Sequence, residues 1–434
     1  IINKNKMNME EIRIAVIGLG YVGLPLARLF STKFKTVGFD MNKSRVDSIM
    51  KGHDATLEVS DSLLQDAITN NHFMCSNELS IIKNCNFYIV AVPTPVDLDN
   101  RPDLRPLLSA SETVGKVISK GDIVVYESTV YPGVTEEECI PLIEKVSGLK
   151  FNEDFFAGYS PERINPGDKE HTVEKIIKVT SGSTPEIAEI IDRVYNKVLV
   201  NGTHKAPSIK VAEASKIIEN SQRDVNIAFM NELAKIFNAM GIDTNDVIAA
   251  ASSKWNFIKL RPGLVGGHCI SVDPYYLIQK AQVYGIFPRI MSAARRLNDG
   301  MGDYIANQVI QLMNKKGILV KDAHILILGV TFKENCPDIR NTKIVDIYSV
   351  LSEYTSNIKV YDPWVNQSKI KEEYGINVIN EDLKNLEGKF DVIILGVAHD
   401  CFKNIQVNDL LKKEYGVVYD VKGVLDRNIV DGRL

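Results

Sequence analysis

Short apolar runs alternate with longer amphipathic segments along most of this chain, and the alternation stops and restarts once. Runs of four to seven apolar, often β-branched residues predict buried strands, and strands separated by helical segments are typical of parallel sheets covered by helices. We therefore expect an α/β fold with two doubly wound domains. The predicted strands are Ile12–Ile17, Thr36–Phe39, Asn86–Val92, Asp122–Tyr126 and Phe156–Tyr159 in the first half, and Ala323–Leu328, Ile358–Tyr361, Phe390–Leu395 and Val417–Tyr419 in the second.

Between the two halves the pattern changes to one long helix. Residues 206–240 contain a proline only near the start, at Pro207, and Gly241 follows directly, which is typical of the start and end of a helix. About 35 residues correspond to about 50 Å of helix. We expect this helix to join the halves and to carry a dimer interface. The expected domains are residues 12–205, 206–316 and 317–434, with a second helical segment over Ser292–Lys316.

Composition narrows the class of protein. Of the 434 residues, 45% are hydrophobic and 24% are charged, as in ordinary globular proteins. The formal net charge of −4 gives no reason to expect nucleic acid as a partner, and no apolar run reaches the ~20 residues of a membrane helix. The six cysteines are scattered without metal-ligand spacing, and the polar N-terminal segment lacks the apolar region of a signal peptide. We expect a cytoplasmic protein with reduced thiols and no bound metal.

The first predicted strand runs directly into a glycine-rich turn. Gly18-Leu19-Gly20-Tyr21-Val22-Gly23 is a G-x-G-x-x-G sequence between a strand and a helix, which is the context of a dinucleotide-binding turn. Asp40 ends the next strand about 20 residues on and could accept the ribose 2′-hydroxyl. An acid there disfavours a 2′-phosphate, so we expect NAD rather than NADP. Arg45 could soften that preference, or lie on the surface of its helix.

Two further strand ends carry threonines. Thr94 follows one strand and Thr129 follows the next, and ligands bind at the carboxyl ends of strands in such sheets. Both are candidate cofactor or active-site contacts, and turn formation is the alternative.

The second half repeats the first weakly. Leu328-Gly329 matches Ile17-Gly18, Tyr361-Asp362 matches Phe39-Asp40, and Tyr419-Asp420 matches Tyr126-Glu127. The phosphate-binding glycines are missing from the second copy, where Val330-Thr331-Phe332-Lys333 stands instead. We infer a second nucleotide site whose phosphates meet Lys333.

A distinctive stretch lies after the long helix. It has two adjacent glycines, Gly266 and Gly267, then Cys269, and Asp273 four residues further on. Glycines allow the backbone to approach a ligand, and the cysteine could act as a thiolate nucleophile. If a helix starts here, Asp273 lies one turn beyond Cys269. The alternative is a glycine turn before a helix with a buried cysteine.

Lys216 and Asn220 fall on one face of the long helix at a spacing of four residues. A catalytic role is one interpretation of Lys216, and a solvated surface lysine is the other.

Several motifs occur in an order and spacing that resemble one family, the UDP-glucose/GDP-mannose dehydrogenases. They are Gly18-x-Gly20-x-x-Gly23, Glu127-Ser128-Thr129-Val130, Ser160-Pro161-Glu162, Glu213-Ala214-Ser215-Lys216 with Asn220, Gly266-Gly267-His268-Cys269 with Asp273, and Gly329-Val330-Thr331-Phe332-Lys333 with Asp338 and Arg340. The resemblance implies two Rossmann-like domains joined by a long helix, and a homodimer formed through that helix.

Three sequences resemble the UDP-N-acetylhexosamine branch of this family. They are Gly266–Cys269, Asp273–Tyr276 and Ser160–Arg163. UDP-glucose enzymes more often have a phenylalanine after the glutamate and a second acid beyond it, whereas this chain has Arg163 and then Pro166-Gly167. UDP-N-acetylglucosamine is the first candidate substrate, and UDP-glucose, UDP-N-acetylgalactosamine and UDP-N-acetylmannosamine are the alternatives.

The implied reaction oxidises the C6 alcohol of the sugar to a carboxylate, with two hydrides passing to NAD. Cys269 could add to the intermediate aldehyde as a thiohemiacetal, which oxidation converts to a thioester. Lys216 could stabilise the oxyanion, Asn220 and Asp273 could hold the water or the alcohol proton, Glu162 could be the base for hydrolysis, and Thr129 could position the water.

The remaining candidate residues are contacts to substrate or cofactor. Substrate contacts are expected from Glu162, Arg163, Lys216, Asn220, Gly266, Gly267, Lys333 and Lys422, and cofactor contacts from Gly18, Gly20, Tyr21, Val22, Gly23, Asp40, Arg45, Thr94, Thr129 and Arg340, which could also contact the substrate. Two other classes stay open: a two-electron hydroxyacid-type dehydrogenase, and a non-catalytic NAD-binding regulator.

Overall fold

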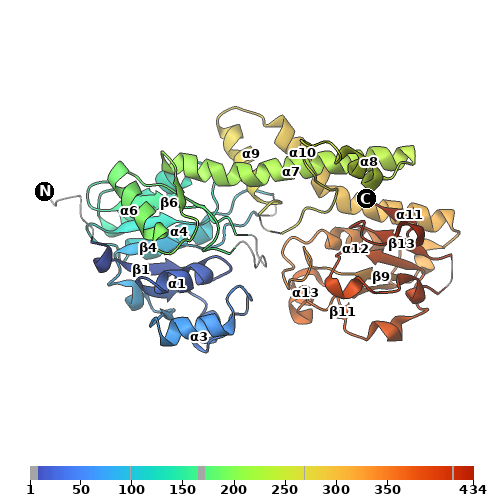
Figure 1. Cartoon of the computed structure of the whole chain (residues 1–434), viewed down its shortest axis with the longest axis horizontal. Coiled ribbons are helices and arrows are strands. Elements are labelled where there is room, and N and C mark those ends of the chain that lie inside the picture. Colours follow the sequence, from blue (N-terminus) through green and yellow to red (C-terminus); the bar gives the residue numbers. More distant parts are fainter. Residues whose placement is uncertain (1–7, 98, 165–171, 268, 413–414) are drawn as a thin grey trace. The chain divides into compact units, whose positions relative to one another are not determined.

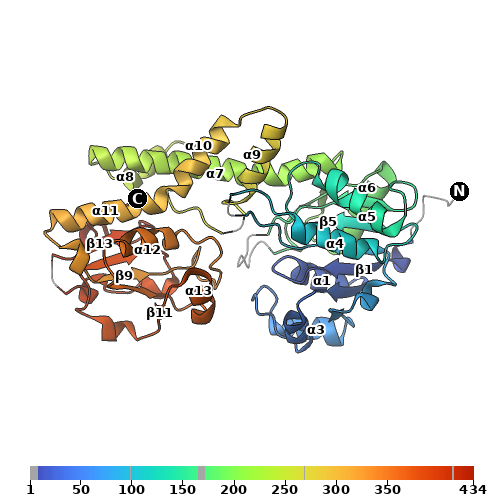
Figure 2. The same cartoon turned by 180° about the vertical axis from the view of Figure 1, so that it is seen from behind.

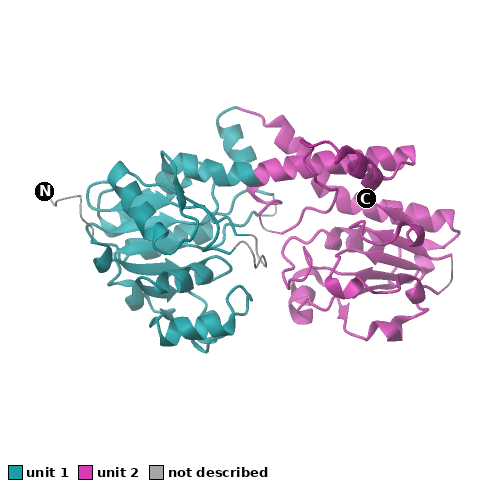
Figure 3. Cartoon of the chain, viewed as in Figure 1, with its two compact units in different colours: residues 1–219, 275–285 teal, residues 220–274, 286–434 magenta. Residues whose placement is uncertain are grey.

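The chain divides into two compact units. The computed structural model describes residues 8–97, 99–164, 172–267, 269–412 and 415–434. Unit 1 consists of the chain up to Glu219 together with Tyr275–Gly285, and unit 2 of Asn220–Pro274 with Ile286–Leu434 (Figure 3). The predicted Pro166-Gly167 turn and His268 lie outside the described residues.

Unit 1 is built on a six-stranded parallel sheet of order β3-β2-β1-β4-β5-β6. This is the doubly wound order of dinucleotide-binding domains, which reverses between β1 and β4. The strands are β1 Arg13–Ile17, β2 Lys35–Phe39, β3 Met74–Ser76, β4 Phe87–Val90, β5 Ile123–Tyr126 and β6 Phe156–Tyr159. A separate parallel pair joins β7 Lys178–Thr180 to β8 Thr203–Lys205.

Helices cover both faces of this sheet (Figures 1 and 2). One apolar core packs strand residues such as Ile14 and Ile89 against α1 Gly23–Ser31, α2 Lys43–Met50, α3 Asp61–Thr69 and α6 Pro185–Asn196. The core of the opposite face packs Ile17 and Val90 against α4 Arg105–Gly115, α5 Ile140–Ser147 and the start of α7 Ile209–Met240. Since both faces are covered, the strands are apolar on both sides, which explains why they are continuous apolar runs in the sequence.

Unit 2 contains a second parallel sheet with the same topology, β11-β10-β9-β12-β13-β14. Its strands are β9 Ile325–Leu328, β10 Ile358–Tyr361, β11 Val378–Ile379, β12 Val392–Leu395, β13 Val417–Asp420 and β14 Gly432–Arg433. One face packs against α11 Met301–Lys315, α12 Ile344–Ser352 and α13 Gln367–Tyr374. The other face is covered by short 3₁₀ turns that bury Leu386, Phe402 and Leu410.

The internal repeat predicted from the sequence extends to individual hydrogen bonds. Gly18 N–H donates to the Phe39 carbonyl at 2.9 Å, and Gly329 N–H donates to the Tyr361 carbonyl at 2.8 Å. Asp40 accepts a hydrogen bond from the backbone after Gly18, and Asp362 accepts one from the backbone after Gly329. The two copies therefore share the turn after the first strand as well as the strand order.

The long helix of the prediction is α7, Ile209–Met240. Its 32 residues correspond to about 48 Å. It begins three residues after the predicted start and ends at the predicted residue, before Gly241. The described residues contain no helix long and apolar enough to cross a membrane.

The helices after α7 differ from the prediction. They are α8 Thr244–Ala251, α9 Asp273–Val283 and α10 Arg289–Asp299. The single helix expected over Ser292–Lys316 is wrong, because Gly300 separates α10 from α11. Glycine is destabilising inside a helix, so ending one helix at Gly300 and starting the next costs little free energy.

Candidate functional site

The glycine turn after β1 has the geometry that a dinucleotide phosphate requires. Gly18 has φ +89°, and a Cβ there would lie 2.8 Å from the Ala91 carbonyl oxygen. A Cβ on Gly23 would lie 1.7 Å from the Gly18 carbonyl oxygen, so helix α1 can approach the strand only with glycine there. A Cβ on Gly20 would meet no atom within 4 Å, so this side of the turn is open. With the N-terminus of α1 directly behind it, the turn fits a pyrophosphate.

Asp40 lies beside this turn, as predicted. Its Oδ2 accepts from Leu19 N–H at 2.8 Å and its Oδ1 from Asn42 N–H at 2.8 Å. Each carboxylate oxygen keeps a lone pair for a ribose hydroxyl. The side chain of Arg45 is only 12% exposed: it donates to the Leu19 carbonyl at 2.8 Å and pairs with buried Asp54 at 2.8 Å. The alternative that Arg45 lies on the helix surface is therefore wrong. Its side chain supports the glycine turn through the hydrogen bond to the Leu19 carbonyl.

The ends of β4 and β5 are joined by side chains. Ser128 Oγ donates to the Val92 carbonyl at 2.7 Å, and Thr94 Oγ1 donates to the Thr129 carbonyl at 2.7 Å. Both contacts lie at the carboxyl ends of β4 and β5, the edge of the sheet at which nucleotides bind in such folds. The Thr94 hydroxyl thus stabilises the turn, which was the alternative interpretation of this residue. Its oxygen can still accept a hydrogen bond from a ligand.

Glu162 is buried and its carboxylate is held on both oxygens. Oε1 accepts from the backbone N–H groups of Arg163 and Ile164, each at 2.6 Å. Oε2 lies 3.3 Å from the ammonium of Lys178, which is itself 2.6 Å from Oε2 of Glu127. Glu162, the candidate base, therefore contacts the buried ammonium of Lys178, a residue that the sequence analysis did not identify as part of the site.

Arg163, a predicted substrate contact, has its guanidinium engaged. It pairs with Glu219 at 2.8 Å and donates to the Ile177 carbonyl at 2.8 Å. A contact from Arg163 to the substrate stays a prediction.

Lys216 is buried in α7, with 6% of the residue exposed. The interpretation of a solvated surface lysine is therefore wrong. One turn earlier, Glu213 is also buried and accepts from Gly133 N–H at 2.6 Å and Thr135 N–H at 3.0 Å. Burial raises the pKa of Glu213 to about 7, against the effect of these two donors. Glu213 fixes the turn after β5 through these two backbone groups.

Cys269 and Asp273 are brought together in unit 2. Cys269 lies in a turn and Asp273 begins α9, so the helix starts at the aspartate and not before the cysteine. Asp273 N–H donates to the Cys269 carbonyl at 2.8 Å, and Asn220 Nδ2 donates to Oδ2 of Asp273 at 2.5 Å. Asn220 and Cys269 therefore both contact Asp273. Cys269 is half-buried, unlike most of the other cysteines.

Gly266 and Gly267 pack against protein on the side where a Cβ would lie. A Cβ on Gly266 would be 2.7 Å from the Asn341 carbonyl oxygen, and one on Gly267 would be 3.0 Å from the Phe332 ring. Gly267 N–H donates to the Arg340 carbonyl at 3.2 Å, and Asn341 Nδ2 donates to the Gly267 carbonyl at 2.9 Å. The glycines thus join the cysteine turn to the segment that follows Lys333.

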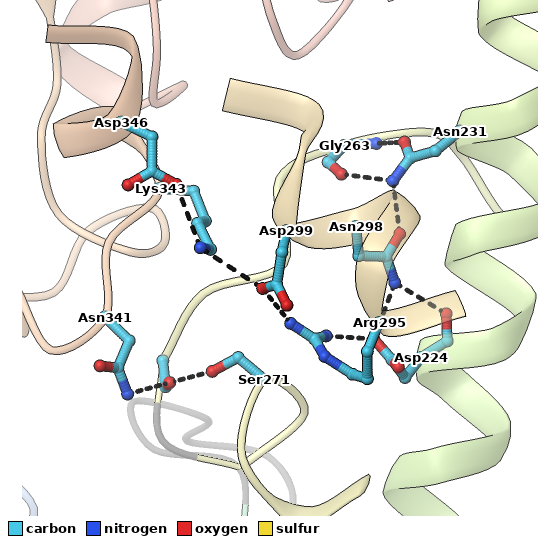
Figure 4. A network of polar contacts seen from close by, with 11 residues as sticks. Asp224, Asn231, Gly263, Ser271, Arg295, Asn298, Asp299, Asn341, Lys343 and Asp346 are labelled. Atoms are coloured by element: carbon cyan, nitrogen blue, oxygen red, sulfur yellow. Dashed lines mark hydrogen bonds and ion pairs between the residues drawn. The ribbon is translucent and has the colours of Figure 1, made fainter. Parts of the chain in front are cut away.

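A polar network holds the approach to this turn (Figure 4). Asn231 of α7 clamps Gly263 through both backbone groups, at 3.0 and 2.8 Å. Asn231 also donates to Asn298 of α10, which in turn donates to Asp224 of α7. Arg295 completes the cluster with ion pairs of 2.5 Å to Asp224 and to Asp299. Apart from the Arg295–Asp299 pair, which lies within α10, these links join α7 to α10 or to the loop that leads to Cys269, so the network fixes that loop on two helices.

The segment carrying Lys333 follows β9. Thr331 N–H donates to buried Asp362 at 3.1 Å, and Thr331 Oγ1 donates to the Lys333 carbonyl at 2.9 Å. Buried His399 accepts from Asn335 N–H on Nδ1 at 2.9 Å, so its Nε2 carries the proton that faces Asp362 at 3.1 Å. Burial alone would raise the pKa of Asp362, but the contacts to His399 and to backbone N–H groups lower it.

The two other basic candidates of unit 2 are paired. Lys422 forms an ion pair of 2.6 Å with Glu334, next to Lys333 in the chain. Arg340 lies against Asp338, with its Nε 2.9 Å from Oδ1. Lys422 is thereby brought to the Lys333 segment, as the phosphate hypothesis requires. A contact from Arg340 to NAD or to the substrate stays a prediction.

Sequence reasoning missed Lys178 and Asn341, and it named Glu127 only as part of a motif and of the internal repeat, without a role in the site. Lys178 did leave a signal, since it is a charged residue inside the apolar run Ile176-Ile177-Lys178-Val179. A charge at a strand position that is buried on both faces indicates a buried partner. The sequence signal of Asn341 is weaker. The backbone of Asn341 has φ +50°, and asparagine is among the few residues that adopt such a conformation readily.

Two doubly wound domains, with an NAD-type turn in the first, define an NAD-dependent dehydrogenase. Residues 12–199 match the NAD binding domain of the UDP-glucose/GDP-mannose dehydrogenase family, residues 210–300 its central domain and residues 326–427 its UDP binding domain. The chain belongs to this family, and its cofactor is NAD.

Several relatives cover nearly the whole chain. The UDP-N-acetyl-D-glucosamine 6-dehydrogenase of Pseudomonas aeruginosa is 56% identical over 98% of this chain and 100% of its own length. The enzyme of the same description from Salmonella typhi is 53% identical over 98% and 99%. Among solved structures, the UDP-D-ManNAc dehydrogenase from Pyrococcus horikoshii aligns with a TM-score of 0.87 at 28% identity, covering 97% of this chain and 98% of that one.

Proposed function

We propose that the chain oxidises the C6 hydroxyl of a UDP-N-acetylhexosamine to the uronic acid, for the synthesis of a surface polysaccharide. UDP-N-acetylglucosamine is the first candidate substrate. The observation that carries this proposal is the 56% identity with the Pseudomonas aeruginosa UDP-N-acetyl-D-glucosamine 6-dehydrogenase, over the full length of that enzyme. A second relative with the same description, at 53% identity, supports it.

The reaction removes four electrons as two hydrides, so each sugar requires two molecules of NAD in succession. The glycine turn of unit 1 would hold each NAD molecule, which supplies the hydride-accepting chemistry when bound. The first oxidation leaves an aldehyde and releases the alcohol proton. The Cys269 thiolate then adds to the aldehyde carbon, and loss of a second hydride from this thiohemiacetal gives a thioester. A water molecule adds to the thioester carbon and gives one proton to Glu162. The C–S bond breaks, and Cys269 leaves as the thiolate.

The polar residues have roles suited to these steps. Lys216, buried in α7, would stabilise the negative oxygen that develops during each addition. Asp273, held by Asn220, would take the alcohol proton or orient the water. Thr129 would position the hydrolytic water.

NAD would be held by the groups that the geometry of unit 1 supports. The Gly18–Gly23 turn, including Tyr21 and Val22, would hold the pyrophosphate, and Asp40 would accept from the ribose. Contacts from Thr94, Thr129 and Arg340 to NAD stay predictions, because they do not follow from the geometry of the glycine turn. Arg45 supports the turn through its hydrogen bond to the Leu19 carbonyl, and a direct contact from Arg45 to NAD stays a prediction.

The nucleotide sugar would be held largely by unit 2. Lys333 follows β9 and Lys422 follows β13, and the ion pair between Lys422 and Glu334 links the two segments. Both lysines would bind the diphosphate, with Lys422 released in part from Glu334. The backbone of Gly266 and Gly267 would contact the sugar, alongside Glu162, Arg163, Lys216 and Asn220.

A panel of nucleotide sugars tests the substrate class. Initial rates of NADH formation would be compared for UDP-N-acetylglucosamine, UDP-N-acetylgalactosamine, UDP-N-acetylmannosamine and UDP-glucose at equal concentrations. We expect the highest kcat/KM with UDP-N-acetylglucosamine and the lowest with UDP-glucose. A preference for UDP-glucose would refute the proposed branch of the family.

We also propose that the active protein is a homodimer in the cytoplasm. Phe229, Ile236 and Met240 lie at spacings of seven and four residues on one face of α7, and each is about half exposed or more. In the same unit Trp255 is 93% exposed, and large apolar side chains exposed on this scale are typical of subunit interfaces. The cytoplasmic location rests on the cysteines, which are free thiols in the structure.

A further inference from the structure

A buried cluster in unit 1 joins Lys178 to two glutamates and a tyrosine. Lys178, the first residue of β7, and Glu127, directly after β5, have side chains with no exposed surface. The Lys178 ammonium lies 2.6 Å from Glu127 Oε2, 3.2 Å from the Pro161 carbonyl and 3.3 Å from Glu162 Oε2. Tyr195 of α6 donates to the other oxygen of Glu127, and its ring centroid lies 5.8 Å from the ammonium.

These contacts keep Lys178 charged. A protonated amine has three N–H groups, and three acceptors surround it among the described residues, whereas a neutral amine would leave one of these acceptors without a donor. Burial would lower the pKa of Lys178, but the charges of Glu127 and Glu162 outweigh burial and raise it. Burial also raises the pKa of Glu127, which the adjacent ammonium opposes.

The cluster has one cation for two carboxylates, and the two contacts are unequal. Glu127 is bound at 2.6 Å with a second donor from Tyr195, so this pair is complete without Glu162. Glu162 is bound more loosely, at 3.3 Å, and its Oε1 accepts two backbone N–H groups. Protonation of Glu162 would therefore leave no stranded charge on Lys178, because Glu127 still neutralises it.

We propose that Lys178 is the positioning residue of the hydrolytic base: it holds Glu162 as a carboxylate aimed at the water, and Glu127 anchors Lys178 while Glu162 gains and loses its proton. This inference rests on the role of Glu162 in the proposed function. Lys178 does not touch the substrate, and it acts through the protonation state and the orientation of Glu162.

Two variants should move the acidic limb of the pH–rate profile in opposite directions. Lys178→Met removes the cation that stabilises the ionised base, so the limb of kcat should move up by about one to three pH units. Glu127→Gln leaves Glu162 as the only carboxylate for Lys178, so the limb should move down. Lys178→Arg should restore most of the wild-type profile, and Lys175→Met, an exposed lysine three residues away, serves as the matched control.

The affected step can be isolated with rapid-quench measurements on the full-length enzyme with NAD and UDP-N-acetylglucosamine. In Lys178→Met at pH 7 the burst of NADH should persist, while the steady-state rate falls at least tenfold and a thioester adduct on Cys269 accumulates in intact mass spectra. If Lys178→Met does not fold, Glu127→Gln/Lys178→Met removes the stranded glutamate charge. This double variant should show the same upward shift of the limb.

The failure of this inference is distinguishable from failure of the proposed function. If Glu162→Gln is slow in hydrolysis but Lys178→Met behaves like Lys175→Met, the role of Lys178 alone is overturned. If Glu162→Gln hydrolyses the thioester at the wild-type rate, the role of Glu162 fails and the Lys178 proposal fails with it. Equal loss of the burst and of the steady-state rate in Lys178→Met would also overturn the proposal, since it would indicate a general structural role.

Discussion

Gly267 meets two demands that other residues cannot. Its φ of +79° lies in the left-handed region, and the Phe332 ring occupies the space where a Cβ would be, at 3.0 Å. The same residue accepts hydrogen bonds from Asn341 and Ser271 on its carbonyl. Two residues before Cys269, this glycine sets the path of the turn that carries the proposed nucleophile.

Gly267→Ala should therefore lower the free energy of unfolding by more than the cost of the left-handed backbone conformation alone. The left-handed conformation costs about 1–2 kcal/mol for a residue with a Cβ, and displacement of Phe332 adds to that. Gly375→Ala is the matched control, because Gly375 has φ +71° and no atom within 4 Å of a Cβ. Chemical denaturation of both variants measures the difference. Equal losses of unfolding free energy would show that the contact with Phe332 contributes nothing.

Cys269 is the residue whose removal should stop the second oxidation. Cys269→Ala cannot form a thioester, so we expect formation of the uronic acid to fall by about three orders of magnitude or more. Cys401→Ser, a change of an exposed cysteine, should leave the rate unchanged. Quantifying the uronic acid by mass spectrometry checks this, and comparable product from Cys269→Ala and the wild type would exclude the thioester route.

At the scale of elements, helices α7 and α10 are locked by a buried ion pair. Arg295 and Asp224 are both buried, and burial raises the pKa of Asp224 against the opposing charge of Arg295. Asn298 and Asn231 extend the contact to Gly263 (Figure 4). A buried charge pair of this kind is costly to break from one side, because the remaining charge has no water to solvate it.

Arg295→Met should destabilise unit 2 by about 3–5 kcal/mol, since it strands the Asp224 carboxylate. Asp224→Asn/Arg295→Met removes both charges and should recover part of the loss. Arg296→Met, at the exposed neighbouring position, should change the free energy of unfolding by less than about 0.5 kcal/mol. Urea unfolding of the three variants tests this, and equal effects of Arg295→Met and Arg296→Met would contradict it.

The elements that were predictable are those with long periodic patterns. The long helix and nine of the strands were predicted from apolar runs and from the position of Gly241. Strands β3, β7, β8, β11 and β14 have two or three residues each and carry no periodicity. The site divides in the same way: Gly18–Gly23 is a local motif, whereas Lys178 reaches Glu127 across 51 residues and Glu162 across 16. Local sequence contains the first kind of information and not the second.

At the scale of the whole molecule, the same strand order occurs twice with different segments after the first strand of each sheet. The first copy has the glycine turn open at Gly20, and the second has Lys333 on a segment held by Asp362. The repeat was predictable because its strand ends match pair by pair. The division into residues 12–205, 206–316 and 317–434 stays a prediction, since the compact units separate within α7.

The proposed dimer gives a second prediction at this scale. Phe229→Glu/Ile236→Glu places two charges on the exposed apolar face of α7 and should dissociate the dimer. Light scattering should then give the mass of one chain, 48.4 kDa, instead of about twice that. Val200→Glu changes an apolar residue that is 73% exposed elsewhere and should leave the dimer intact. A wild-type protein that is monomeric at micromolar concentration would contradict the proposed dimer.

The number of NADH molecules formed per sugar tests the central claim most directly. The wild-type protein would be given a limiting amount of UDP-N-acetylglucosamine and excess NAD, and NADH absorbance would be read at completion beside the quantity of uronic acid. The account predicts two NADH and one uronic acid per sugar consumed. One NADH per sugar, with an aldehyde or ketone as the final product, would contradict it and identify a two-electron dehydrogenase instead.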